Sequence, residues 1–150
     1  MQKIIKIKGQ ELRNIDEGIF ITGQISEDMM QEIKNENFCM IINNRPDYEE
    51  INQIKNEDLK YLAESLGVNY YSIPFSGNNL QNNQIKEFAN LVQDYDKKAL
   101  IFCRSGARSS LIWGLASIMY LGVNEDEVIK KITNIGYDAS IIPKMVEHFS

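Results

Sequence analysis

Hydrophobic positions in this chain fall into two patterns, short continuous apolar runs and longer stretches in which apolar residues recur every three or four positions. The continuous runs predict short buried strands within residues 12–22 (two strands), 38–43, 69–74 and 99–102. The periodic stretches predict helices over about 26–34, 57–66, 85–92, 109–121, 125–135 and 139–148. Because strands alternate with helices, we expect a single α/β domain over residues 1–150, with a mostly parallel central sheet covered by helices.

Three details refine this layout. Residues 109–121 are apolar on nearly all sides, which predicts a helix in the centre of the domain. Ser26 is a suitable N-cap for the first helix, and Gly67 is expected to end the second.

Composition limits the function. A hydrophobic fraction of 43% and a charged fraction of 25% are typical of a soluble globular protein. The net charge of -5 argues against binding to nucleic acid or to an anionic membrane surface, which would need a basic face. No apolar run is long enough for a signal peptide or a membrane span, so we expect a cytoplasmic protein.

The chain contains two cysteines and one histidine. Cys39 falls inside an apolar run and is predicted to be an inert, buried thiol. Neither a disulfide framework nor a zinc site is expected from so few ligands, and no cofactor is expected.

Cys103 opens the run Cys-Arg-Ser-Gly-Ala-Arg-Ser, between a predicted strand and the predicted central helix. At the carboxyl edge of a parallel sheet, the backbone N–H groups of such a loop converge with the helix N-terminus on one point. That point favours negative charge, either a bound oxyanion or the thiolate of Cys103 itself. We therefore predict a reactive thiolate in a site for a small anion.

Each other residue of the run has an expected part. Arg104, Ser105, Gly106 and Ala107 supply the loop backbone, and Gly106 lets it curl without a side-chain clash. Arg108 offers a two-pronged donor to a tetrahedral anion. Ser109 is expected to donate to the Cys103 sulfur or to cap the helix, while Arg104 either contacts substrate or faces solvent.

The run resembles the active loop of rhodanese-type sulfurtransferases and, more broadly, the phosphate-binding loop of cysteine-dependent tyrosine phosphatases. Over residues 18–115 the chain resembles the bacterial beta-lactamase-hydrolase-like proteins. The stretches that carry this resemblance are residues 23–26, 42–47, 70–74 and 102–109. It implies a dual-specificity-phosphatase-like domain. The phosphatase-like domain of that family also occurs fused to metallo-β-lactamase-type persulfide-oxidising enzymes, which implies such an enzyme as a partner.

The chain departs from the phosphatase pattern in three ways. Four residues rather than five separate Cys103 from Arg108, Phe102 stands where phosphatases usually have His, and residues 75–79 contain no acid. Asp47 is a candidate general acid, although it also fits a solvated turn. Arg45 either adds positive charge to the mouth of the site or is an exposed loop arginine.

Three functions remain open at this stage. We favour sulfur transfer, in which Cys103 takes a sulfur atom from a small anionic or persulfide donor, because thiol–sulfur exchange proceeds without a general acid. The alternative is phosphate-ester hydrolysis through a phospho-cysteine. A non-catalytic anion-binding module is the third.

Overall fold

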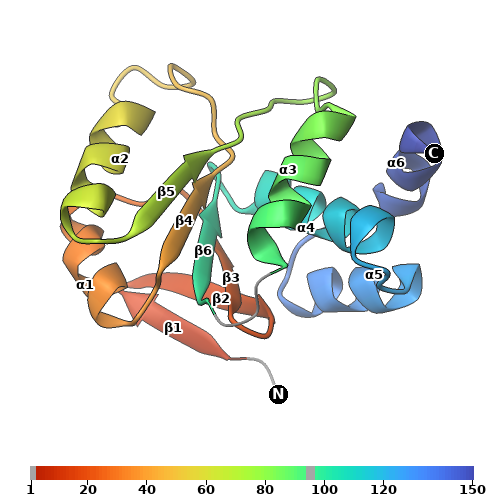
Figure 1. Ribbon diagram of the computed structural model, residues 1–150, viewed down its shortest axis with the longest axis horizontal. Helices are drawn as coiled ribbons and strands as arrows, with labels where there is room; N and C mark the ends of the chain where they lie inside the picture. Colours follow the sequence, from red (N-terminus) through yellow and green to blue (C-terminus); the bar gives the residue numbers. More distant parts are fainter. Residues whose placement is uncertain (1–2, 94–96) are drawn as a thin grey trace.

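A computed structural model describes residues 3–93 and 97–150 (Figure 1). Within these residues six strands form one sheet in the order β1-β2-β3-β6-β4-β5. Their bounds are β1 Ile4–Ile7, β2 Gln10–Asp16, β3 Ile19–Thr22, β4 Met40–Asn43, β5 Asn69–Ser72 and β6 Ala99–Phe102. Strands β3, β6, β4 and β5 are parallel, whereas β1 and β2 extend the sheet as antiparallel neighbours of β3. The mixed α/β fold is confirmed, and β1 is a strand that the apolar pattern did not predict.

Helices cover both faces of the sheet (Figure 1). The elements are the 3-10 turn η1 Glu27–Met29 and the helices α1 Met30–Asn35, α2 Asn56–Ser65, α3 Asn82–Val92, α4 Ala107–Tyr120, α5 Glu125–Asn134 and α6 Ile142–Phe149. Helices α1 and α2 lie on one face, and α3 to α6 on the other. The domain therefore has three layers, with the sheet between two layers of helices.

The central strands divide their side chains between two hydrophobic cores. Successive residues of a strand point to opposite faces, so Ile41 and Leu100 join the core under α1 and α2. Their neighbours Ile42 and Ile101 join the core under α3 to α6. All four are fully buried, which explains why these strands are continuously apolar in the sequence.

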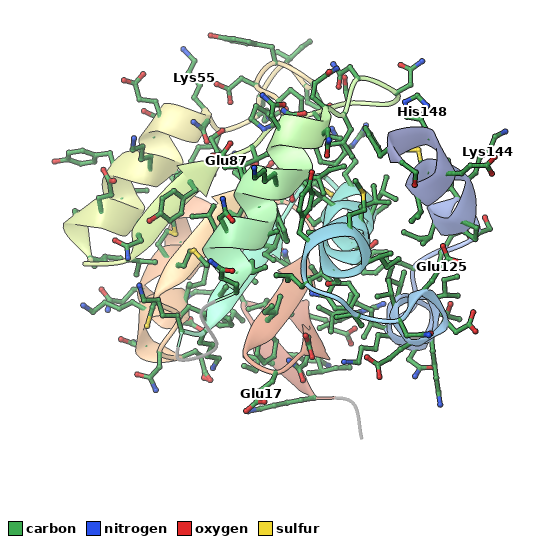
Figure 2. The ribbon with its side chains drawn as sticks, turned by 45° about the vertical axis from the view of Figure 1, so that its right-hand side comes forward. Glu17, Lys55, Glu87, Glu125, Lys144 and His148 are labelled. Atoms are coloured by element: carbon green, nitrogen blue, oxygen red, sulfur yellow. The ribbon has the colours of Figure 1, made fainter. Side chains whose placement is uncertain are left out.

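Helix α4 lies in the interior of the domain, as its all-round apolar sequence predicted. Trp113 is 1% exposed, and α3, α5 and α6 all contact α4. A Cβ on Gly114 would lie 2.9 Å from Ile132 of α5 and 3.1 Å from Ile142 of α6. The absence of a side chain there lets both helices pack close to α4, while charged residues such as Glu125 and Lys144 stay at the periphery (Figure 2).

One prediction about a single residue was wrong, and the positions predicted for two others are confirmed. Cys39 is exposed rather than buried, since it lies outside the sheet, just before β4 begins at Met40. Ser26 is the N-cap residue of η1, with an extended backbone, but its hydroxyl donates to the Asp28 carboxylate and makes no capping hydrogen bond. Gly67 ends α2 as expected, with a φ of 79°.

Candidate active site

Three parallel strands, β3, β6 and β4, end side by side and bring their following residues together. Gln24 follows β3, Cys103 follows β6 and Arg45 follows β4. The backbone N–H of Gln24 donates to the Arg104 carbonyl at 3.1 Å. A Cβ on Gly23 would lie 2.8 Å from that same carbonyl oxygen, so only glycine allows β3 to approach the loop this closely.

Cys103 is fully buried at the base of this loop. The backbone N–H of Gly106 donates to the Cys103 sulfur at 3.1 Å. Gly106 has a φ of 100° and is the N-cap of α4, which begins at Ala107. A backbone donor and a helix N-terminus therefore both face the sulfur, so this end of the loop presents positive electrostatic potential.

Arg108 directs its guanidinium fork at a carboxylate of the protein itself. Its Nη1 donates to Glu49 Oε2 and its Nη2 to Glu49 Oε1, both at 2.8 Å. Nη1 also donates to the Phe75 carbonyl at 3.1 Å. This is the two-pronged geometry that an oxyanion would use, so Glu49 holds the place of a bound anion.

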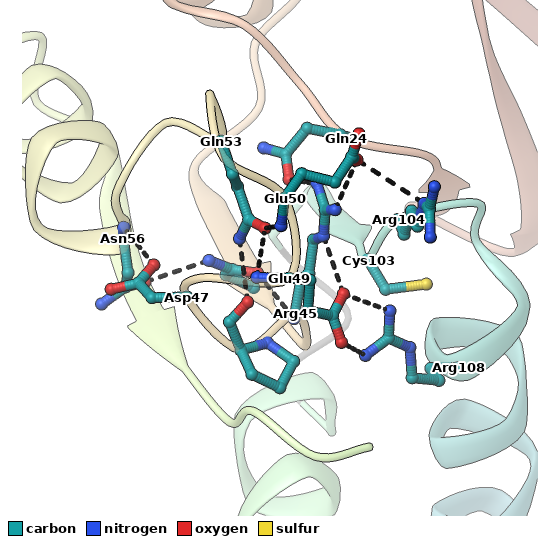
Figure 3. A network of polar contacts seen from close by, with 12 residues as sticks. Gln24, Arg45, Asp47, Glu49, Glu50, Gln53, Asn56, Cys103, Arg104 and Arg108 are labelled. Atoms are coloured by element: carbon teal, nitrogen blue, oxygen red, sulfur yellow. Dashed lines mark hydrogen bonds and ion pairs between the residues drawn. The ribbon is translucent and has the colours of Figure 1, made fainter. Parts of the chain in front are cut away.

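Arg45 is 2% exposed and is therefore not an exposed loop arginine. Its Nε donates to Glu49 at 2.9 Å, its Nη2 to Glu50 at 2.7 Å and its Nη1 to Gln24 at 2.9 Å. The more exposed Arg104 lies 3.6 Å from the same Glu50 carboxylate. Two adjacent carboxylates thus pair with all three arginines around Cys103 (Figure 3).

These pairs shift the ionisation of the groups involved. Hydrogen bonds from Arg108 lower the pKa of Glu49 to about 2, against the opposing effect of burial and with help from Arg45. The hydrogen bond from Arg45, followed by the charge of Arg104, lowers the pKa of Glu50. The pKa of Arg108 is raised, first by Glu49 and then, after the opposing effect of burial, by the charge of Cys103. Both carboxylates are ionised at neutral pH.

The remaining candidates lie elsewhere than the sequence suggested. Asp47 accepts a hydrogen bond from the backbone N–H of Asn56 at 2.8 Å and lies beside the start of α2, turned away from the Cys103 sulfur (Figure 3). Ser109 donates to the Asn44 side-chain oxygen at 2.8 Å, so it neither bonds the sulfur nor caps α4. It lies inside the first turn of that helix, where its hydroxyl points to the residue after β4.

Open pockets flank Arg104 on both sides. One of about 960 Å³ is lined by Gln24, Ile25, Arg45, Ile51, Ile54 and Arg104, among others. The other, of about 540 Å³, is lined by residues that include Arg13, Thr22, Arg104, Ser105 and Tyr137. A substrate larger than a simple oxyanion has room on either side of the loop.

Residues 11–119 match the family model of the phosphatase-like domain of beta-lactamase hydrolase-like proteins. The chain belongs to this family. It is 29% identical over 115 residues to a beta-lactamase hydrolase-like protein of Xylella fastidiosa (strain Temecula1 / ATCC 700964), covering 77% of this chain and 27% of the relative. The corresponding protein of Agrobacterium fabrum is 25% identical over 136 residues, covering 91% and 32%. The chain therefore spans about a third or less of these curated relatives.

Solved structures with the same fold include phosphatases. A "putative phosphatase" from Neisseria meningitidis z2491 is 26% identical with a TM-score of 0.77, covering 91% of this chain and 96% of that one. PTPMT1 is 15% identical with a TM-score of 0.71, covering 91% of each chain, and shows the fold alone. The expected family and the dual-specificity-phosphatase-like fold are thus confirmed.

Sequence reasoning missed Glu49. The pair Glu49-Glu50 follows the predicted Arg-Pro-Asp loop, and this local concentration of acid was the available signal. Its partner Arg108 lies 59 residues further along the chain, so the contact could be found only from the fold.

The first prediction is that Glu49→Gln binds sulfate about tenfold more tightly than the wild type, equivalent to about 1.4 kcal/mol, because Arg108 no longer holds a competing carboxylate. Isothermal titration calorimetry measures the affinity, and Glu64→Gln on the exposed face of α2 is the matched control. Unchanged or weaker binding in Glu49→Gln would show that Glu49 orients Arg108 rather than competing for it.

The second prediction follows from the pKa of Glu49, which is lower in the folded protein than its ordinary value of 4.5. A depressed carboxyl pKa stabilises the fold above the unfolded value, and that contribution is lost as pH falls towards about 2. Glu49→Gln should therefore be less stable than the wild type above about pH 5, and the difference should shrink on acidification. Urea unfolding over this range tests it. A difference independent of pH would contradict the ion pair.

The third prediction concerns the fork of Arg108. Arg108→Lys should lose nearly as much anion affinity as Arg108→Ala, since each lost charge-assisted hydrogen bond costs about 1.5–3 kcal/mol. The affinity of both variants for sulfate is measured in the Glu49→Gln background, where no carboxylate occupies the fork. Full retention of binding by the lysine variant would show that Arg108 acts only as a point charge.

Proposed function

We propose that this domain is a cysteine-dependent enzyme of the phosphatase type, in which Cys103 forms a covalent bond to the group that it transfers. The hydrogen bond from the Gly106 N–H to the Cys103 sulfur, at the N-terminus of α4, is the observation that carries the proposal. Family membership and the phosphatase fold support it.

In phosphate-ester hydrolysis, the Cys103 thiolate attacks phosphorus and the bond from phosphorus to the leaving oxygen breaks. The loop N–H groups and the Arg108 fork stabilise the charge on the phosphoryl oxygens. Water then attacks the phospho-cysteine, which releases inorganic phosphate and regenerates the thiolate. Substrate binding requires Glu49 to leave Arg108, because the carboxylate occupies both terminal nitrogens of the fork.

In the part of the chain that the structure describes, the site offers no evident general acid to protonate the leaving group. Among the described residues, the carboxylates that contact the site arginines are Glu49 and Glu50, and both have lowered pKa values. Asp47 accepts a hydrogen bond from the backbone N–H of Asn56 at the start of α2. We therefore infer that the leaving group departs unprotonated, which favours aryl phosphates and phosphoanhydrides over alkyl phosphates.

Sulfur transfer is the second candidate, favoured by the same lack of an acid and by the four-residue spacing between Cys103 and Arg108. The thiolate would attack the outer sulfur of thiosulfate or a persulfide, and the sulfur–sulfur bond would break to release sulfite or a thiolate. An acceptor thiolate would then take the sulfur from Cys103. A persulfide-oxidising metallo-β-lactamase-like partner belongs to this candidate. The comparisons favour phosphate-ester hydrolysis, since the solved relatives reported above are named as phosphatases or share their fold.

The fourth prediction separates the candidates by the leaving group. Hydrolysis of a series of aryl phosphates should depend steeply on the acidity of the phenol, and alkyl phosphates should react about 10²–10⁴-fold more slowly, because no acid assists departure. Steady-state rates give this dependence. Cys103→Ser should abolish turnover, and Asp47→Asn is the matched control that should keep it.

The same preparation is exposed to thiosulfate and to a small persulfide, and its intact mass is measured. An added sulfur atom on Cys103, removable by dithiothreitol, without ester turnover would favour the second candidate. Fast alkyl-phosphate hydrolysis that collapses in Asp47→Asn would overturn the inference that the leaving group departs unprotonated. Neither reaction, with sulfate binding retained, would leave a non-catalytic anion-binding module and overturn both enzymatic proposals.

A further inference from the structure

The peptide unit between Ser105 and Gly106 is held from both of its ends. Its N–H, on Gly106, donates to the Cys103 sulfur at 3.1 Å. Its C=O, on Ser105, accepts a hydrogen bond from the Tyr137 hydroxyl at 2.9 Å. Because a trans peptide is planar, with its C=O and N–H pointing in opposite directions, fixing the carbonyl also fixes the direction of the N–H.

Tyr137 also occupies the space that a side chain on Gly106 would need. A Cβ built on Gly106 would overlap the Tyr137 hydroxyl. Gly106 has a φ of 100°, a conformation that glycine adopts without strain and that leaves its peptide free to turn unless something restrains it. The tyrosine is that restraint on the outer side of the loop.

The position of Tyr137 is itself determined by two elements. At the end of α5, the N–H of Gly136 donates to Thr133 and the N–H of Tyr137 donates to Ile132, which together form a Schellman motif. From β2, Arg13 donates to the Ile135 carbonyl at 2.6 Å, and its guanidinium lies 5.9 Å from the centre of the Tyr137 ring. The phenol is thereby directed at the loop.

We propose that Tyr137 is a positioning residue for the Cys103 thiolate, which acts by keeping the Gly106 N–H directed at the sulfur. This rests on the proposed function in that Cys103 is the nucleophile. The residue lies outside the span 11–119 that matches the family model. Donation to the carbonyl also polarises the peptide and strengthens its N–H as a donor.

Charged groups surround this peptide on the side of Cys103 and on the side of Tyr137. Arg108 and Arg104 flank Cys103, Arg13 faces the tyrosine ring and pairs with Glu11, and Glu49 is held by Arg108. Burial, together with the charge of Cys103, raises the pKa of the Tyr137 phenol against the opposing charge of Arg13, so the hydroxyl remains a donor. A change in reactivity between neutral and alkaline pH therefore reports the Cys103 thiol.

The fifth prediction compares Tyr137→Phe with the wild type, both in a Cys39→Ser background, so that Cys103 is the thiol that reacts with iodoacetamide. At about pH 6.5, alkylation of Cys103 should be about three- to tenfold slower in Tyr137→Phe, as expected for a hydrogen bond of ordinary net strength. At about pH 9.5, which is above the ordinary pKa of a cysteine thiol, the two rates should agree within about twofold. Tyr61→Phe, which removes the hydroxyl of an exposed tyrosine on α2, is the matched control.

The pH dependence separates positioning from a general structural effect. If Tyr137→Phe and the wild type reacted at equal rates at both pH values, the proposal would be overturned. A slowing of Tyr137→Phe by the same factor at both pH values would also overturn it, because that would mean altered access to the sulfur. Urea unfolding of Tyr137→Phe establishes that the variant is folded. A wild-type protein whose Cys103 is not alkylated at either pH would instead contradict the nucleophile itself, and with it the proposed function.

Discussion

A guanidinium removed from water must keep both its charge and its hydrogen bonds, and Arg45 meets this requirement with two carboxylates and an amide oxygen. An unpaired charge at 2% exposure would cost several kcal/mol, so the chain after β4 has to bring acids back over the sheet edge. The residue Glu49 that satisfies Arg45 also reaches Arg108. The need to pair one buried arginine thus determines what faces the Cys103 loop.

This pairing gives the site a particular electrostatic balance. The three arginines would attract anions strongly if they were free, yet Glu49 and Glu50 neutralise much of their charge in the structure described here. An incoming anion must displace a carboxylate from the arginines. The free energy of binding is therefore the difference between the arginine–anion hydrogen bonds that form and the arginine–carboxylate hydrogen bonds that break. Substrate affinity in such a site depends on how far the rest of the substrate uses the pockets on either side of Arg104.

The sequence predicted the central elements well because burial on both faces leaves a direct signature. The strands that contain Ile41 and Ile101, and the helix that contains Trp113, are apolar over most of their length and lie within two residues of their predicted bounds. Single side chains were harder, since their partners are set by the fold. Cys39 is exposed just before the strand, which begins two residues later than expected, and Ser109 donates to Asn44, which lies 65 residues away. No local pattern distinguishes these outcomes.

The two sides of the Cys103 loop are supported by parts of the chain that differ in kind. Glu49, on the arginine side, lies within the span that matches the family model, whereas Tyr137, on the backbone side, lies beyond it. The close packing of α5 against Gly114 of α4 is what lets the end of α5 reach Ser105. The end of α5 can therefore set the direction of one peptide N–H without altering any residue of the loop. The N–H donor that faces the Cys103 sulfur is thus coupled, through a single peptide unit, to a segment that lies more than thirty residues further along the chain.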